Sequence, residues 1–370
     1  MGTRPSFLAH NWKLTLNIVT VIALVGLVYV IRHQIVDTFH NLHRVNLWWI
    51  ASMVPIQIVN YHAQTKLYQG LFTVVGNRLR FWPVYRVALE LNFVNHVFPS
   101  GGVSGISYFG VRLRRGDITG GKATLVQAMK LALVFISFEV LLVVGLLFMA
   151  SEGRINNLVI LAASSISTLM VVGTLATVYV IRSERRIQVT FRALTEFVNS
   201  VVRVVMPHKH EILSLARVER VVQEFHTNYK VIERNYTKLK GPFWWALVIN
   251  ATEVAAIYVV YIAFGEWVNL GAVIVAYAVA NFAGLVSVLP GGVGVYEALM
   301  TGVLAAAGVP AALSLPVTVM YRVINTLIQV PPGYYLYHRS LHSLDSKQDD
   351  IQLAAAHSTD EEGHEQRPEL

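Results

Sequence analysis

The stretch Leu-Pro-Gly-Gly-Val-Gly-Val-Tyr-Glu at residues 289–297 interrupts a hydrophobic segment, and Phe-Pro-Ser-Gly-Gly-Val-Ser-Gly at residues 98–105 interrupts another. Proline and glycine at membrane depth leave main-chain amide and carbonyl groups unpaired, which hydrocarbon does not tolerate unless these groups face protein or water. Two such breaks at corresponding positions of two halves are typical of the binding site of a secondary transporter. Plain turns or proline kinks between helices are the alternative interpretation.

The composition indicates a polytopic membrane protein. Apolar residues make up 54% of the 370 residues, charged residues make up 14%, and the mean hydropathy is +0.50. Several apolar runs are long enough to cross a bilayer core of roughly 30 Å. The net charge of +8 comes from basic residues beside these runs, which indicates a cytoplasmic membrane surface and no nucleic-acid partner. The chain has no cysteine, which excludes disulfides and thiolate metal sites.

The apolar runs predict an all-α polytopic membrane protein with about six membrane-spanning helices and two re-entrant broken hairpins. The helices are expected at 14–31, 47–67, 123–150, 157–181, 243–264 and 313–337, and the hairpins at 84–111 and 270–309. No small-residue cleavage pattern follows the first run, so we expect it to stay as an anchor.

The basic segments predict an inverted-topology repeat. If the segments 66–80, 112–122 and 182–240 are all cytoplasmic, the two hairpins enter the membrane from opposite faces. Residues 14–150 and 157–337 then each read helix, helix, re-entrant hairpin, helix. We expect the plasma membrane as the location, with both termini in the cytoplasm.

Two further segments have distinct compositions. Residues 182–240 combine basic residues with apolar residues at helical spacing, which predicts amphipathic helices on the inner leaflet. Residues 338–370 are polar and acidic, which predicts a disordered cytoplasmic tail.

Ionisable residues inside the apolar runs are candidates for a polar site, because each costs about 2.5 to 3.5 kcal/mol at the centre of a membrane helix. Glu297 directly follows the second break and Arg322 lies in the last predicted helix. An arginine fork suits a phosphate group, so the two residues could bind a lipid head group. A buried structural ion pair is the alternative interpretation. The other candidates, which could form an intramembrane charge network, are Glu90, Lys130, Glu139 and Glu253.

Residues around the two breaks complete the predicted transport site, since glycine lets a backbone approach a substrate closely. In the first half these are Asn92, Asn95, Pro99, Ser100, Gly101, Gly102 and Gly105, and in the second half Pro290, Gly291, Gly292, Gly294, Tyr296, Glu297 and Arg322. For Asn92 and Asn95, hydrogen bonding between helices is an equally compatible role.

The sequence favours no cofactor, no metal and no enzymatic chemistry. His208, His210 and Glu211 lie in a basic segment without a further ligand group at metal spacing. The apolar runs offer no combination of nucleophile, base and orienting residue. We therefore do not expect an enzyme.

Both glycine–proline motifs, the basic turn with Arg112, Arg114 and Arg115, and Tyr321-Arg322 together resemble the lysylphosphatidylglycerol synthase transmembrane-region family, also called flippase-like. The resemblance covers roughly residues 14–338. It implies lipid movement between leaflets, because the membrane domain of multiple peptide resistance factors in this family is held to move aminoacylated phospholipid. No soluble aminoacyl-transferase domain follows in the sequence, so synthase activity is not expected. Lys130 stands where the family is expected to carry an arginine with an acidic neighbour, which leaves its role open.

The expected function is therefore an integral membrane lipid flippase-like transporter for a charged phospholipid or a lipid-linked head group. Expected partners are membrane lipid (an anionic or aminoacylated phospholipid, or a polyprenyl-linked substrate), a separate lipid-modifying enzyme and a second copy of the chain. The alternatives are a carrier of a small soluble solute, a catalytic or non-catalytic component of lipid or glycan synthesis, and a channel.

Overall fold

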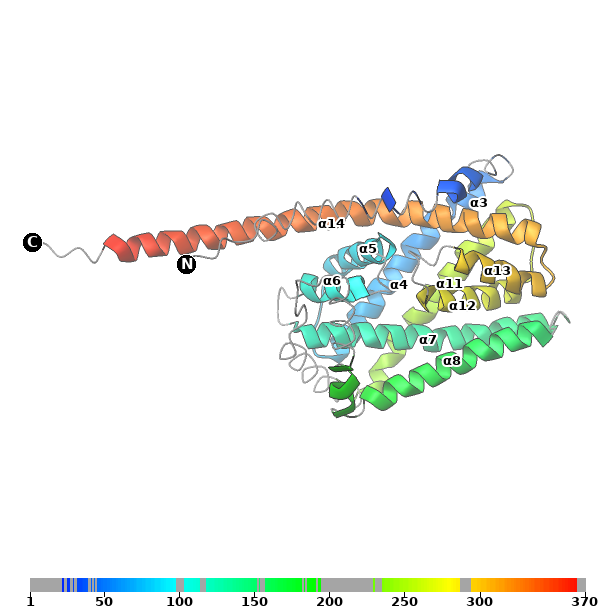
Figure 1. Cartoon of the computed structure of the whole chain (residues 1–370), viewed down its shortest axis with the longest axis horizontal. Helices are drawn as coiled ribbons and strands as arrows, with labels where there is room; N and C mark the ends of the chain where they lie inside the picture. Colours follow the sequence, from blue (N-terminus) through cyan, green and yellow to red (C-terminus); the bar gives the residue numbers. More distant parts are fainter. Residues whose placement is uncertain are drawn as a thin grey trace, which may run out of the picture.

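The chain forms a bundle of α-helices with one long helix that extends beyond it (Figure 1). The structure is a computed structural model, and it describes residues 45–97, 103–113, 118–151, 157–181, 235–286 and 294–364, together with 32–38, 185–190 and isolated positions nearby. All regular elements among these residues are helical. The expectation of an all-α protein is confirmed.

The described helices fall into two halves. The first half contains α3 (Leu47–Ala51), α4 (Met53–Val74), α5 (Phe81–Val97), α6 (Val103–Leu113) and α7 (Gly120–Ser151). The second half contains α8 (Asn157–Ile181), the short 3-10 helix η2 (Tyr236–Leu239), α11 (Lys240–Ala263), α12 (Leu270–Val286), α13 (Val295–Ala306) and α14 (Ala311–His364).

Four stretches of described helix are long and apolar enough to cross a membrane: Gly120–Ser151, Asn157–Ala176, Tyr236–Ala263 and Ala311–Ser340. Large apolar side chains on the outer faces of α7 and α8, such as Leu147, Leu158 and Leu175, are more than half exposed. Surfaces of this kind are stable in contact with lipid tails rather than water. The expectation of a membrane protein is confirmed.

Two of the six predicted membrane helices are not among these four. Most of the predicted helix at 14–31 lies outside the described residues. α4 has 22 residues but carries the buried polar side chains Gln57, Asn60 and Gln64, which lower its hydropathy. α4 packs on α11 and α5, and its exposed face carries apolar side chains such as Val54 and Ile58.

α4 and α11 pack against each other in opposite directions. The main-chain N–H of Asn46, just before α3 and α4, donates to the carbonyl of Ala263 at 2.9 Å. Further along, Asn60 Nδ2 donates to the carbonyl of Ile249 at 3.2 Å. Residue numbers therefore rise along α4 as they fall along α11, and the two helices are antiparallel.

α5 and α6 form the first hairpin. Gly105 on α6 lies against the side chain of Asn95, and Arg112 at the end of α6 forms an ion pair with Glu90 at 2.9 Å. Lys122 Nζ at the start of α7 donates to Asn77 Oδ1, before α5, at 3.1 Å. The hairpin therefore begins and ends at the same end of the bundle. Its break, residues 98–102, lies outside the described residues.

α12 and α13 form the second hairpin, at the opposite end of the bundle. Gly271 at the start of α12 lies against Gly145, which is close to the end of α7. α13 packs on α12 and then on α14, and the connection between α13 and α14 lies at that same end in Figure 1. Residues 287–293, which contain the second break, lie outside the described residues.

α14 combines an apolar part inside the bundle with a polar extension (Figure 1). Gly333 packs against Phe93 of α5, and the helix contains Pro316, Pro331 and Pro332. The sequence predicts a disordered tail from residue 338, whereas the structure continues the helix to His364. The run Leu353 to Ala356 consists of strong helix formers, which favours a helix in this part of the tail.

The predicted amphipathic segment at 182–240 lies mostly outside the described residues. Within it, residues 185–190 are helical, and Tyr236–Leu239 form the turn that leads into α11.

Candidate functional site

A cavity of about 370 Å³ lies where helices of both halves meet. It is lined by side chains from α4, α5, α7, α11, α12, α13 and α14. The polar ones include Asn92, His96, Lys130, Glu253, Tyr277, Tyr296, Tyr321 and Arg322. Ionisable groups in a membrane protein usually face a partner or a water-filled space, and this cavity gives them such a space.

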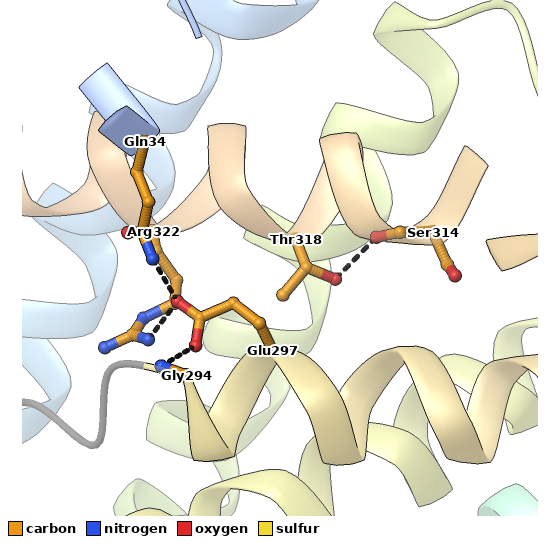
Figure 2. A network of polar contacts seen from close by, with 6 residues as sticks. All are labelled: Gln34, Gly294, Glu297, Ser314, Thr318 and Arg322. Atoms are coloured by element: carbon orange, nitrogen blue, oxygen red, sulfur yellow. Dashed lines mark hydrogen bonds and ion pairs between the residues drawn. The ribbon is translucent and has the colours of Figure 1, made fainter. Parts of the chain in front are cut away.

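Glu297 and Arg322 form an ion pair beside the second break, as Figure 2 shows. Glu297 Oε1 accepts hydrogen bonds from the Arg322 guanidinium and from Gln34 Nε2, the latter at 2.9 Å. The Arg322 guanidinium also lies 4.9 Å from the centre of the Tyr296 ring. One carboxylate therefore joins α13 to α14 and to a residue near the start of the chain.

Glu297 also stabilises the first turn of its own helix. Its Oε2 accepts from the main-chain N–H of Gly294 at 2.6 Å, which satisfies one of the donors left free at a helix start. Gly294 has a φ of 87°, a left-handed conformation that favours glycine. The glycine of the second motif is thus required for the turn that brings Glu297 to Arg322.

A second cavity of about 340 Å³ lies on the other side of this ion pair. It is lined by Gln34, Asp37, Thr38 and Glu297, together with residues 315, 316 and 319 of α14. Glu297 lines this second cavity and Arg322 lines the central one. The ion pair therefore stands between the two cavities.

Glu253 on α11 is the carboxylate of the central cavity. Its Oε2 accepts from Tyr321 Oη at 2.7 Å, and its Oε1 accepts from Asn60 Nδ2 at 3.1 Å. Within the part of the chain that the structure describes, Glu253 forms no ion pair with a basic residue. Its hydrogen-bond partners there, Tyr321 and Asn60, are neutral.

A chain of amide side chains extends from this carboxylate between α4 and α14. Gln57 Nε2 donates to Asn325 Oδ1 at 2.6 Å, and Gln329 Nε2 donates to the same oxygen at 3.0 Å. Asn325 Nδ2 reaches Tyr321 Oη at 3.4 Å. These bonds link the two halves of the bundle through side chains that are almost fully buried.

Lys130 of α7 is the second cation on the wall of the central cavity. Its Nζ donates to Tyr68 Oη at 3.1 Å and lies 5.0 Å from the centre of the same ring. Tyr68 in turn donates to Gln127 at 3.2 Å. No carboxylate among the described residues pairs with Lys130.

The structure brings only part of the predicted transport site together. Asn92, Tyr296 and Arg322 line the central cavity, and Gly294 and Glu297 line the second one. Asn95 lies against Gly105 within the first hairpin. Outside the described residues lie Pro99, Ser100, Gly101, Gly102, Pro290, Gly291 and Gly292, as well as His208, His210 and Glu211.

The four residues of the predicted charge network have separate partners. Glu90 accepts from Arg112 and from Tyr108 Oη, the latter at 2.7 Å. Glu139 accepts from Ser167 Oγ at 2.5 Å. Lys130 and Glu253 share the central cavity but bond to Tyr68 and to Tyr321 with Asn60.

The sequence-based prediction missed the buried amide side chains Gln57, Asn60, Gln64, Asn325 and Gln329. Their signal was the spacing of Gln57, Asn60 and Gln64, and that of Tyr321, Asn325 and Gln329, at intervals of three or four. Such intervals place side chains on one face of a helix. A polar stripe within an apolar helix would have pointed to a buried contact between helices.

Comparison with known proteins identifies the family. The chain matches the family described as Lysylphosphatidylglycerol synthase TM region over residues 16–333, which include all the residues that line the central cavity. A UPF0104 membrane protein of Methanothermobacter thermautotrophicus (strain Delta H) is 35% identical over 91 residues, or 25% of this chain and 27% of that protein. A second match to a UPF0104 membrane protein of the same organism is 24% identical over 252 residues, or 68% of this chain and 72% of the relative. The chain therefore belongs to the Lysylphosphatidylglycerol synthase TM region family of membrane proteins.

Proposed function

We propose that the protein is a flippase-like transporter that moves a lipid with a charged head group between the two leaflets. The central cavity carries this proposal, because it offers Arg322, Lys130 and Glu253 within a bundle whose outer surface is apolar. Its volume of about 370 Å³ falls within the roughly 300–1,000 Å³ typical of small-ligand pockets. A head group held there avoids the cost of crossing hydrocarbon, while the acyl chains remain in the bilayer.

The contacts between the halves support an inverted repeat. Gln57 of α4 bonds to Asn325 of α14, and Asn250 of α11 bonds to the Val134 carbonyl of α7 at 3.1 Å and to Ser137 Oγ. The contact between α4 and α14 therefore corresponds to the contact between α11 and α7. A symmetry operation that maps α4 onto α11 and α14 onto α7 would map the first contact onto the second. Because α4 and α11 are antiparallel, a two-fold axis relating them would lie in the membrane plane. Transporters that rock one repeat against the other have such an axis.

The packing of the two hairpins is consistent with the same symmetry. α5 of the first hairpin packs on α14, and α12 of the second packs on α7. Each hairpin is followed by the long helix on which the other hairpin packs. This arrangement supports two re-entrant hairpins that enter from opposite faces and flank the central cavity.

Exposed tryptophans support the placement in a bilayer. Trp48 and Trp267 are exposed at the end of the bundle where α4 begins, and Trp82 and Trp244 at the end where α11 begins. The 22 residues of α4 span about 33 Å, close to the thickness of a hydrocarbon core. Tryptophan is enriched at both membrane interfaces.

Basic residues support a cytoplasmic side. Arg78, Lys122 and Lys240 lie at the end that carries Trp82 and Trp244. Positive charges favour the cytoplasmic face of the plasma membrane, so we propose that this end faces the cytoplasm. The extension of α14 leaves the bundle at the end where α7 begins, and would lie on the same side (Figure 1).

Leaflet exchange in proteoliposomes tests the proposal. Fluorescent phospholipids in the outer leaflet are quenched by a membrane-impermeant reductant, so protein-dependent exchange raises the quenched fraction. We expect head-group-dependent exchange that falls in Arg322→Gln and persists in Glu139→Gln, because Glu139 bonds to Ser167 and does not line the central cavity. Exchange no faster than in protein-free vesicles overturns the proposal. Bulk ion flux would instead identify a channel, and altered lipid mass an enzyme.

A further inference from the structure

Glu253 lies near the middle of α11, a helix that is long and apolar enough to cross a membrane. At 1.5 Å per residue, it lies roughly 20 Å from the start of α11 and roughly 15 Å from its end. Its side chain lines the central cavity. The carboxylate therefore lies at bilayer depth on the wall of a polar space.

Glu253 differs from the carboxylates of the two hairpins in the kind of partner it has. Glu90 pairs with Arg112, and Glu297 pairs with Arg322. A guanidinium has donors and no acceptor, so it holds the paired carboxylate in the ionised form. Within the residues that the structure describes, Glu253 has no such cation. An ionised carboxylate in these surroundings is costly, and binding a proton removes that cost.

The hydrogen bonds of Glu253 are compatible with both of its protonation states. Asn60 Nδ2 donates to Glu253 Oε1 at 3.1 Å, and this oxygen can accept as a carboxylate or as the carbonyl of a carboxylic acid. Tyr321 Oη donates to Oε2 at 2.7 Å. A hydroxyl can also accept, and its hydrogen rotates freely, so the same pair of oxygens can stay bonded with a proton on Glu253. Oε2 is therefore the atom that can take up a proton.

The other titratable groups of the cavity come from several helices. They are His96 of α5, Lys130 of α7, Tyr277 of α12, Tyr296 of α13, and Tyr321 and Arg322 of α14, and Tyr61 of α4 interacts electrostatically with Glu253. Lys130 and Arg322 each bond to a partner other than Glu253. Among the described residues that line this cavity, Glu253 is the acid.

The contacts of Glu253 join the two halves of the bundle. Asn60 lies on α4 of the first half, and Tyr321 lies on α14 of the second. The contacts continue from Tyr321 to Asn325 at 3.4 Å and from Asn325 to Gln57 of α4 at 2.6 Å. Hydrogen bonds to an ionised group are roughly twice as strong as those between neutral groups. Uptake of a proton by Glu253 therefore weakens the contacts that hold α11 against α4 and α14.

We propose that Glu253 is a proton-binding site, and that a proton on its Oε2 allows the two halves to move relative to each other. The proposal rests on the proposed function and names the ion that is coupled to it. The carboxylate takes one proton from water on one side of the membrane and releases it to the other side after the movement. No bond of the lipid changes. Lipid exchange then depends on pH, and a proton gradient can drive it.

Proton entry and lipid exchange are measured in the same proteoliposomes of the full chain. The vesicles consist of phosphatidylethanolamine and phosphatidylglycerol with a short-chain fluorescent analogue of each, and they enclose the pH-sensitive dye pyranine. Albumin extracts the analogues from the outer leaflet, and valinomycin with potassium clamps the membrane potential. While Glu253 is mainly ionised, exchange should accelerate about tenfold for each unit of acidification, as a single protonation gives. The dye should report proton entry above that of protein-free vesicles.

Glu253→Gln is neutral at every pH, so its exchange should be fast and independent of pH, without added proton entry. Glu139→Gln is the matched control, because Glu139 also bonds to a hydroxyl, that of Ser167, but does not line the central cavity. It should keep the pH dependence and the proton entry. The same pH dependence in Glu253→Gln as in the unchanged protein overturns the proposal.

Histidine also titrates near neutral pH, so His96→Gln tests the other candidate in the cavity. We expect His96→Gln to keep the pH dependence, and its loss in His96→Gln but not in Glu253→Gln overturns the proposal. If Glu253→Gln does not fold, Tyr321→Phe decides. It removes a donor to the ionised form, so the pH of half-maximal exchange should rise by about one unit. An unchanged midpoint overturns the proposal.

The two readouts separate this proposal from the proposed function. Exchange that does not depend on pH in the unchanged protein retains the flippase and overturns the proton site. Proton entry that requires Glu253 but occurs without lipid exchange retains the proton site and overturns the flippase.

Discussion

Gly145 on α7 and Gly271 on α12 lie against each other so closely that a Cβ atom on Gly271 would overlap the carbonyl oxygen of Gly145. This is where the second hairpin meets the first half. Small residues allow membrane helices to approach to main-chain contact, which apolar side chains in lipid do not achieve by the hydrophobic effect alone. A corresponding close contact joins the first hairpin to the second half, where a Cβ on Gly333 would lie 2.6 Å from Phe93 Cβ.

Replacing Gly271 with valine should force α12 away from α7. The helices have no room for the added methyl groups, and overpacking of this kind costs about 1 to 3 kcal/mol. We expect a lower thermal unfolding temperature in detergent. Gly173→Val on α8 is the control, because no atom lies within 4 Å of a Cβ built there. Equal unfolding temperatures for the two variants would contradict the close contact.

The contributions of Glu297 and Arg322 to the free energy of unfolding should be strongly coupled. Arg322→Met leaves a carboxylate that is 6% exposed without its cation, and breaking such a buried pair is strongly destabilising. The double variant with Glu297→Gln removes both charges and should recover part of the loss. A double-mutant cycle on the free energy of unfolding should give a coupling of about 1 to 3 kcal/mol. Additive effects would show that the two side chains act independently.

The first hairpin depends on the buried carboxylate of Glu90. Glu90 is 1% exposed, and Arg112 supplies its positive partner. Arg112→Leu should therefore destabilise the protein by about 3 kcal/mol. Tyr108→Phe removes only a neutral donor from the same carboxylate and should cost about 1 kcal/mol. Thermal unfolding in detergent should give a lower unfolding temperature for Arg112→Leu than for Tyr108→Phe. The reverse order would contradict the role of Arg112 as the partner of Glu90.

The orientation can be tested with two cysteines, since the chain has none of its own. Trp244→Cys and Trp267→Cys place single thiols at exposed positions on opposite ends of α11. In sealed right-side-out vesicles, a membrane-impermeant maleimide should label the thiol at 267 and spare the one at 244. Labelling of both from outside would contradict the placement of α11 across the membrane.

The sequence predicts the broad architecture well because it rests on apolar length and on proline and glycine. The expected hairpin at 84–111 corresponds to α5 and α6, and the one at 270–309 to α12 and α13. Helix ends were harder to place, since α7 begins at Gly120, three residues before the predicted start, and α14 continues past its apolar part to His364. Hydropathy does not mark where a helix begins or ends, because a helix can continue into polar residues at either end.

The candidate site was only partly predictable. The sequence singles out Glu297 and Arg322 as ionisable residues in apolar runs, but it leaves open whether they pair or bind a head group. The pairing of Glu90 with Arg112 depends on how α6 folds back on α5, and the amide contacts of Gln57 with Asn325 join residues 268 positions apart. Hydrophobic patterns carry no information on which polar faces meet across such distances.

Pro331 and Pro332 divide α14 into two mechanical units. Proline has no N–H, so the carbonyls of Leu327 and Ile328 receive no hydrogen bond from the next turn. The unit before this joint carries Tyr321, Arg322 and Gln329 into the cavity, and the unit after it rests on α5 through Gly333. Bending at this joint meets less resistance than elsewhere along the helix, so the segment that lines the central cavity and the segment that packs on α5 need not move as one body.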